Sequence, residues 1–132
     1  MRSEDIRAEL RAADAALAAS ELLVTADLCS DAMSRAYYAV LHYVRSLLLS
    51  VDIVPRSHHG AFVHFGREFV KPGIISQDYN RILVRLMKLR EEADYITGST
   101  FSCENVETVL QNVREFRAKT IEILGERNYT VE

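Results

Sequence analysis

The chain has 132 residues and a formal net charge of −3 at pH 7, with 48% hydrophobic and 27% charged residues. This length predicts one domain with one hydrophobic core, and the charge excludes the globally basic composition typical of many nucleic-acid-binding proteins. The longest apolar stretch, "VRSLLLSV", is interrupted by Arg45 and is too short to span a bilayer. The N-terminus lacks the apolar core of a secretory signal, so we predict a cytoplasmic protein without membrane association.

The cysteines and histidines show no spacing typical of a metal or cofactor site. Cys29 and Cys103 form no paired motif, and we predict reduced thiols in the core or at an interface. None of the four histidines has a glutamate three positions before it, as an inward-facing di-iron bundle would need. There is also no glycine-rich phosphate loop. We therefore expect neither a metal nor a cofactor.

Helical periodicity begins near the N-terminus. Ser3 is a candidate cap for a first helix, because Glu4 and Asp5 follow it where a helix dipole favours acids. After a turn at 25–28, a second helix is predicted over "CSDAMSRAYYAVLHYVRSLLLS". The buried faces of these two helices are predicted to contain Ile6, Leu10, Ala13, Leu17, Val24, Met33, Ala36, Tyr37, Val40, Val44, Leu47 and Leu48.

A polar stripe follows another face of the second predicted helix. It consists of Asp31, Arg35, Tyr38, His42 and Arg45. Arg35 and His42 are seven residues apart, which places them two turns apart on one face. From the pattern alone, such a stripe is more typical of a solvated or interface surface than of a binding site.

Three further helices are predicted. Ser57 caps a short third helix, and the "KPG" sequence at 71–73 ends it. Gly66 lies inside that helix at a cost in helix propensity, which predicts a close approach of another backbone. Ser76 caps the fourth helix and Ser102 the fifth. Their apolar faces, together with that of the third, are predicted to contain Phe62, Phe65, Phe69, Tyr79, Ile82, Leu83, Leu86, Leu89, Ala93, Val106, Val109, Leu110, Val113, Phe116 and Leu124.

The end of the fourth predicted helix, "RLMKLREEADYITGS", carries an acid where a helix dipole disfavours one. Gly98 stops this helix, so Asp94 lies in its last turn, with a dipole cost of about 0.3–1 kcal/mol. Arg90 can pair with Asp94 at i, i+4, which as a surface ion pair contributes about 0.3 kcal/mol. Stability alone therefore gives little reason for this acid, and Arg90, Asp94 and Tyr95 are candidate site residues.

These elements predict an all-α fold. Strand-like alternation is missing and the predicted loops are short, so neighbouring helices are expected to run antiparallel in a five-helix up-and-down bundle. We predict a single helical domain over 1–126 and a flexible tail over 127–132.

Three sequences occur in order at the spacing of a known family: "SRAYYAVLHYVRSLLL", "SHHGAFVHFGREFVKPGII" and "LREEADY". Together they resemble the HEPN family (higher eukaryotes and prokaryotes nucleotide-binding), in its branch of small stand-alone bacterial and archaeal proteins. The resemblance covers nearly the whole chain. It implies a HEPN-like five-helix bundle that is usually a homodimer.

The resemblance also implies two kinds of function. Many HEPN proteins are metal-independent ribonucleases in which an arginine is followed, after four to six residues, by a histidine in the dimer cleft. Others pair with a small nucleotidyltransferase in a toxin–antitoxin system, and in some pairs a HEPN tyrosine is modified. Here Arg90 matches the motif arginine, but Tyr95 stands where a four-residue spacing would put the histidine. A phenol with an ordinary pKa near 10 is a poor proton shuttle at neutral pH.

The first hypothesis is a binding module, a HEPN homodimer that binds a nucleotide or RNA and pairs with a nucleotidyltransferase-type protein. Phosphate would contact Arg35 and Arg90, with Asp94 orienting Arg90. The base or sugar would contact Tyr38 and Tyr95, and His42 and His58 would complete the binding set. The structural alternative for His58 is a hydrogen bond to a neighbouring helix end. We expect no DNA partner.

The second hypothesis is an enzyme, a metal-independent endoribonuclease toxin that uses Arg90 with a non-standard base. That base would be Asp94, His58 or His42 from the same cleft. The spacing from Arg35 to His42 also satisfies the arginine-to-histidine rule, but these residues lie on a different helix from the family motif. A structural dimer without a small ligand is the third interpretation.

Overall fold

The computed structural model describes residues 2–95 and 103–129, without the side chains of Asp94 and Tyr95. Within these residues the chain forms five α-helices and one π-helical turn, with no strand, so the predicted all-α fold is confirmed. The elements are α1 (Arg2–Thr25), α2 (Cys29–Leu49), α3 (His58–Phe65), the π-helical turn η1 (Gly66–Val70), α4 (Gln77–Tyr95) and α5 (Cys103–Glu126).

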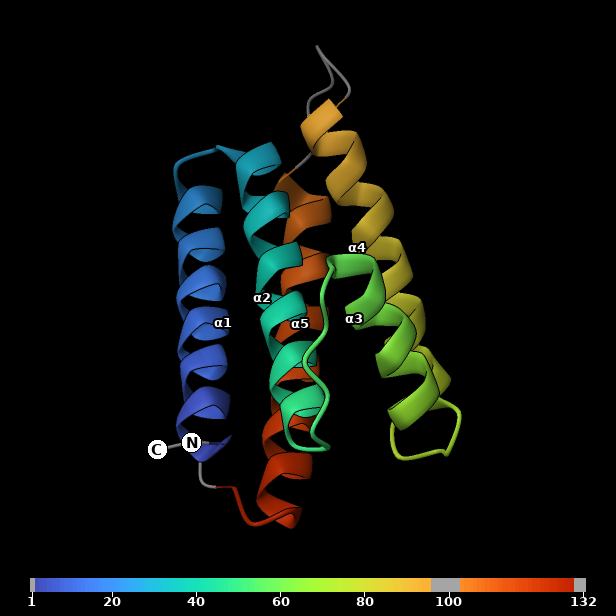
Figure 1. Ribbon diagram of the computed structural model, residues 1–132. Coiled ribbons are helices and arrows are strands. Elements are labelled where there is room, and N and C mark those ends of the chain that lie inside the picture. Colours follow the sequence, from blue (N-terminus) through green and yellow to red (C-terminus); the bar gives the residue numbers. More distant parts are fainter. Residues whose placement is uncertain (1, 96–102, 130–132) are drawn as a thin grey trace.

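The helices form an up-and-down bundle around α2. Figure 1 shows α1 and α2 running antiparallel, with α5 beside them and α4 inclined on the other side. The short α3 lies next to α4, after a connection that turns back along the bundle (Figure 1). Because α2 packs against α1, α3, α4 and α5, it is the central helix and brings its polar stripe close to several other elements.

The core explains why α2 takes this central place. More than half of its residues are buried, including Tyr37 at 4% exposure, whose predicted core position is confirmed. One neighbouring helix cannot cover an apolar face this wide. Each Å² of apolar surface removed from water stabilises the fold by about 25 cal/mol, which favours a position of α2 among several helices. The largest fully buried side chains from the whole described chain include Ile6, Met33, Tyr43, Leu47, Phe65, Phe69, Leu83, Leu110, Phe116 and Leu124.

Helix caps confirm two of the predicted boundaries. The Ser57 hydroxyl oxygen accepts from the Gly60 amide at 2.9 Å, and that of Ser76 accepts from the Asp78 amide at 3.0 Å. The predicted cap at Ser3 is wrong, because α1 already begins at Arg2 and Ser3 lies in its first turn. The predicted cap at Ser102 and the predicted stop at Gly98 lie outside the described residues.

Gly66 has a different role from the predicted one. No neighbouring atom lies within 4 Å of the position where its Cβ would be, so the prediction of a close backbone approach is wrong. Instead, Gly66 begins the π-helical turn, which ends at Val70 with both Phe69 and Val70 buried. Gly73, with φ of +84°, then supplies the left-handed conformation that ends this segment as predicted.

The prediction of reduced cysteines is wrong. Cys29 and Cys103 are joined in a disulfide, with Cα atoms 5.3 Å apart, across a sequence separation of 74 residues. The two residues meet because they are the first residues of α2 and α5, which begin at the same end of the bundle (Figure 1). This proximity is set by helix packing, and no local cysteine motif signals it.

The start of the predicted tail folds back on the bundle. The Tyr129 amide donates to the Leu124 carbonyl at 2.9 Å, and the Arg127 guanidinium lies 5.6 Å from the centre of the Phe69 ring. The predicted domain bounds remain a prediction. No helix in the described ranges, 2–95 and 103–129, combines the length and apolar character needed to cross a membrane.

Candidate functional site

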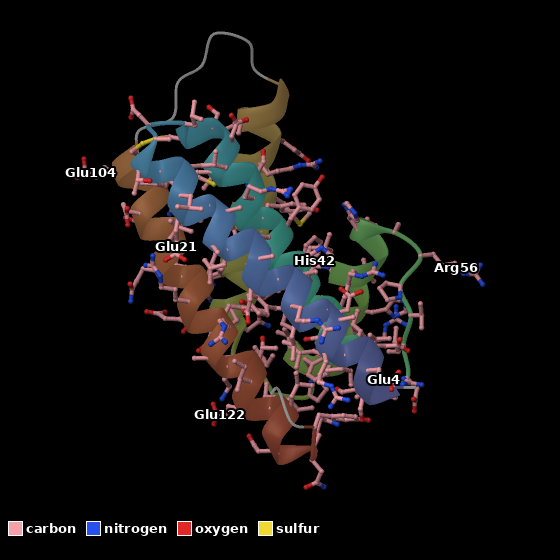
Figure 2. The ribbon with its side chains drawn as sticks, turned by 90° about the vertical axis from the view of Figure 1, so that its left-hand side faces the viewer. Glu4, Glu21, His42, Arg56, Glu104 and Glu122 are labelled. Carbon is pink, nitrogen blue, oxygen red and sulfur yellow. A yellow bond between two sulfur atoms is a disulfide. The ribbon has the colours of Figure 1, made fainter. Side chains whose placement is uncertain are left out.

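The polar stripe of α2 faces a pocket. Arg35, Tyr38 and His42 line a cavity of about 320 Å³, whose other wall is α1. That wall is made of small side chains, those of Ala12, Ala15 and Ala16. In Figure 2 His42 lies where α1, α2 and the start of α3 come together. Three of the four residues predicted to bind a nucleotide or phosphate therefore share one cavity.

Arg90 reaches this stripe from α4. Its Nη2 donates to the Tyr38 hydroxyl at 3.3 Å, and its guanidinium lies 4.9 Å from the Tyr37 ring centre and 5.7 Å from that of Tyr38. Guanidinium groups are attracted to aromatic faces at such distances, by about 0.5–2 kcal/mol depending on desolvation. The fold thus joins two clusters that are 52 residues apart in the sequence, and it presents Arg90 beside Tyr38.

His58 joins the same cluster from the start of α3. Its ring centre lies 6.0 Å from that of Tyr38 and 6.2 Å from that of Tyr37. Burial lowers the pKa of His58, and the positive charges of Arg90, Arg45 and His42 lower it further. These ring contacts place His58 in the cluster, and the predicted hydrogen bond to a helix end remains a prediction.

Glu9 on α1 adds a carboxylate to the cluster and was not predicted from the sequence. Its Oε2 lies 2.7 Å from His42 Nδ1, and its Oε1 accepts from Arg45 Nε at 3.1 Å. Burial raises the pKa of Glu9, but the hydrogen bonds and charges of His42 and Arg45 outweigh this and hold it below the ordinary value. Glu9 is therefore ionised at neutral pH. In the sequence it is one acid among several on the first helix, without a distinguishing signal.

The result is a locally basic cleft in a protein of net charge −3. Arg35 and His42 line the cavity. Three further basic side chains lie close to this cluster, so that three helices contribute: Arg45, His58 and Arg90. Glu9 is shared between two of them. The basic side chains outnumber this carboxylate, and an excess of positive charge attracts ligands of the opposite sign, such as a phosphate group.

Two predicted residues cannot be placed in this cleft. Asp94 and Tyr95 are the last two residues of α4, but their side chains lie outside the described residues. Their predicted roles, orientation of Arg90 and contact with a base or sugar, remain predictions.

A second polar network, also missed from the sequence, lies where α1, α2 and α5 meet. The hydroxyl of the fully buried Tyr43 donates to Asp14 Oδ1, which also accepts from Arg117 Nε at 2.8 Å. Burial raises the pKa of Asp14, but its hydrogen bonds to Arg117 and Tyr43 lower it below the ordinary value overall. Burial and the same carboxylate raise the pKa of Tyr43 far above its usual range. This network gives the hydroxyl of a buried tyrosine its hydrogen-bond partner, which is a structural role.

One group of described residues has the spacing of metal ligands. Single ligand atoms of Asp27, Cys29 and Cys103 lie within 4.8 Å of one another. Because the two sulfurs are joined to each other, neither is a thiolate that could bind a metal in this form.

Comparison with known proteins agrees with the fold. The sequence model of the HEPN domain family matches residues 6–124 of this chain. "Putative toxin MJ0605" of Methanocaldococcus jannaschii is 35% identical over 113 residues, which cover 86% of this chain and 84% of that protein. "Putative toxin MJ0142" of the same organism is 30% identical, with 88% and 79% covered, and a "UPF0332 protein" of Thermotoga maritima is 30% identical, with 74% of each chain covered. The resemblance is confirmed, and this chain belongs to the HEPN domain family.

Proposed function

We propose that this protein is a toxin-like HEPN protein whose basic cleft binds RNA or a nucleotide. The observation that carries the proposal is the meeting of Arg90 with Tyr37 and Tyr38 beside a cavity also lined by Arg35. The toxin names of two relatives support the toxin-like part.

The cleft offers a distinct group for each part of a nucleotide. Arg35 and Arg90 carry the forked donors that suit phosphate oxygens. Both guanidinium groups lie near Tyr38, each 5.7 Å from its ring centre. A base or sugar could stack on this ring, as bases do on aromatic platforms in single-stranded RNA complexes. Arg90 bound to a tyrosine hydroxyl is already oriented, so less side-chain entropy is lost when phosphate binds.

Two partners belong to the proposal. A homodimer would place two such clefts side by side, as the family resemblance implies. A nucleotidyltransferase-type protein would be the second component of a toxin–antitoxin-like system, since a toxic cleft needs a protein that neutralises it.

Replacement of Arg90 by alanine tests the proposal. We expect the affinity for a fluorescein-labelled single-stranded RNA to fall by about tenfold or more, because a hydrogen bond to a charged group contributes about 1.5–3 kcal/mol. The slope of log affinity against log salt should fall by about 0.7 if one phosphate contact is lost. Fluorescence anisotropy at several salt concentrations measures both quantities.

Arg56 offers a matched control, because it is an exposed arginine that points away from the body of the protein (Figure 2). The variant Arg56→Ala removes the same charge from the chain and should bind nearly as the wild type does. Equal loss of affinity in both variants would indicate a general charge effect, and equal affinity of Arg90→Ala and wild type would overturn the proposal.

A further inference from the structure

We infer that Asp27, Cys29 and Cys103 form a binding site for Zn²⁺ when the disulfide is reduced. The inference is independent of the basic cleft and goes beyond the proposed function. The three residues meet at one end of the bundle, where the disulfide lies beside the start of α5 (Figure 2). Asp27 follows the end of α1, whereas Cys29 and Cys103 are the first residues of α2 and α5. One ion bound there would hold three segments of the chain together.

The carboxylate of Asp27 faces both sulfurs, and the disulfide gives no reason for this position. Its Oδ1 lies 3.4 Å from Cys103 Sγ and 3.9 Å from Cys29 Sγ. The sulfurs of a disulfide carry no hydrogen, so neither of them can donate a hydrogen bond to this oxygen. Within the described parts of the chain, no arginine, lysine or histidine forms an ion pair with this carboxylate. A cation between the carboxylate and the reduced sulfurs would account for all three groups.

The backbone around Asp27 holds the carboxylate in place without requiring it. Asp27 has φ of 62°, in the left-handed region that glycine most often occupies after a helix. Its amide donates to the Val24 carbonyl at 3.0 Å, and the Leu28 amide donates to the Leu23 carbonyl at 2.9 Å. Glycine would satisfy this turn with less strain than any residue with a side chain. The turn therefore does not explain the carboxylate, which is explained by what it contacts.

The distances from the carboxylate to the sulfurs fit a single tetrahedral Zn²⁺. Bonds of about 2.3 Å to sulfur and about 2.0–2.2 Å to oxygen place a sulfur and an oxygen ligand about 3.5 Å apart. The observed 3.4 and 3.9 Å lie on either side of this value. After reduction the sulfurs are no longer bonded and separate, which makes room for the ion. With Cα atoms 5.3 Å apart, both side chains can still reach one ion.

The ligand types select Zn²⁺ over the common hard cations. Zn²⁺ accepts both thiolate and carboxylate ligands, whereas Mg²⁺ and Ca²⁺ bind oxygen ligands. Both cysteines begin helices, where the helix dipole favours a negatively charged thiolate. Three protein ligands leave the fourth tetrahedral position to a water molecule. Cys29 is only 6% exposed, but Asp27 is exposed and Cys103 partly so, and the site is open to an ion and a reductant from solvent.

The site belongs to the reduced chain only. A dithiol transfers two electrons and two protons to the disulfide and becomes a disulfide itself, which leaves two thiols on the protein. Binding of Zn²⁺ then releases both thiol protons to the solvent. A disulfide oxidant takes the two electrons back, restores the bridge and releases the ion. This end of the bundle is thus cross-linked in both redox states, by the disulfide or by Zn²⁺.

The experiment compares the reduced and the oxidised full chain. The reductant is a phosphine, which takes oxygen from water to become its oxide and leaves no competing thiol in solution. After its removal without air, Zn²⁺ is titrated in competition with a chromogenic chelator, and Co²⁺ serves as a spectroscopic probe. We expect one Zn²⁺ per reduced chain, and with Co²⁺ the charge-transfer absorption of thiolate ligands. The oxidised chain keeps all four histidines and should bind no ion at this site, so it controls for ions held by histidine.

Two variants test the ligands, and a third is the matched control. Cys103→Ser should lower the Zn²⁺ affinity of the reduced chain by about 100-fold or more, and Asp27→Asn by about tenfold or more, since even groups that only support a metal ligand contribute about 10–100-fold. Asparagine tolerates the same left-handed backbone. Asp52 is also exposed, with φ of 65°, but it follows the other end of the 21-residue α2, roughly 30 Å away from Cys29. Asp52→Asn should bind Zn²⁺ as the wild type does.

Thermal unfolding shows whether the ion binds the folded chain. Zn²⁺ should raise the Tm of the reduced wild type and leave that of Cys103→Ser unchanged, because an ion that binds only the folded state stabilises it. An unchanged Tm with Zn²⁺ bound would assign the ion to thiols of the unfolded chain and overturn the inference. So would a reduced wild type that binds no more Zn²⁺ than the oxidised chain, or an Asp27→Asn variant with wild-type affinity.

Discussion

Replacement of Cys103 by serine is expected to lower the free energy of unfolding by about 2–4 kcal/mol, because it opens a cross-link that restricts the unfolded chain. The disulfide spans 74 residues, and the chain-entropy account gives roughly 4 kcal/mol for a loop of this length. Cys103 is the better position for this test, since it is partly exposed whereas Cys29 is buried. Thermal unfolding should show a decrease in Tm of roughly 10 °C for a domain of this size.

Reductant provides the control for this experiment. Dithiothreitol should lower the Tm of the wild type to that of Cys103→Ser and should leave the variant unchanged. Thiol titration of the unfolded, unreduced wild type should detect no free cysteine. A wild-type Tm that does not respond to reductant would show that the bridge contributes nothing to stability.

Replacement of Asp14 by alanine should destabilise the fold by about 1–3 kcal/mol, the cost of leaving a buried polar group without its partner. Tyr43 is fully buried and donates its hydroxyl to Asp14. The ion pair of Asp14 with Arg117 adds little, because their side chains are 45% and 41% exposed and solvent screens the pair to below about 1 kcal/mol. Chemical denaturation at neutral pH measures the difference in the free energy of unfolding.

Two variants separate the hydrogen bond from the ion pair. Glu21 also joins α1 to α5, through Arg114, at a similar exposure but without a buried tyrosine. Glu21→Ala should therefore cost no more than about 0.5 kcal/mol, as exposed pairs do. In a Tyr43→Phe background, Asp14→Ala should lose most of its effect, because no hydroxyl is left unsatisfied. An unchanged cost in that background would assign the effect to Arg117 instead.

The pH dependence of this variant has a definite sign. The pKa of Asp14 is lower in the folded protein than its ordinary value of 3.8, so the ionised carboxylate stabilises the folded state. This contribution to the free energy of unfolding is complete above pH 3.8. The contribution is lost as pH falls through the folded pKa. The stability difference between wild type and Asp14→Ala should therefore be largest at neutral pH and shrink below about pH 4.

Much of the fold follows from local patterns in the sequence. Apolar residues at helical spacing predict the five helices, and the caps at Ser57 and Ser76 are where the sequence places them. These features depend on residues three or four positions apart, which are neighbours on a helix whatever the rest of the chain does. Ser3 shows the limit of such signals, because a residue suited to capping can also lie inside the first turn.

The candidate site was predictable only in its parts. The stripe of Arg35, Tyr38 and His42 follows from periodicity on one helix, and Arg90 stands out through the family motif. Glu9 could not be found in this way, because it lies 33 residues from His42 and no local rule relates the two. The same is true of Asp14, which is 103 residues from Arg117.

The sequence by itself determined that the chain is helical, which faces of its helices are apolar, and which residue types lie on the polar face of α2. Only the tertiary structure decided that this face meets Arg90 and Glu9, and that the cysteines form a bridge. The physical reason is the range of the interactions. Helix periodicity and capping are local, whereas the rotation and crossing of packed helices depend on how all the apolar faces fit together in one core.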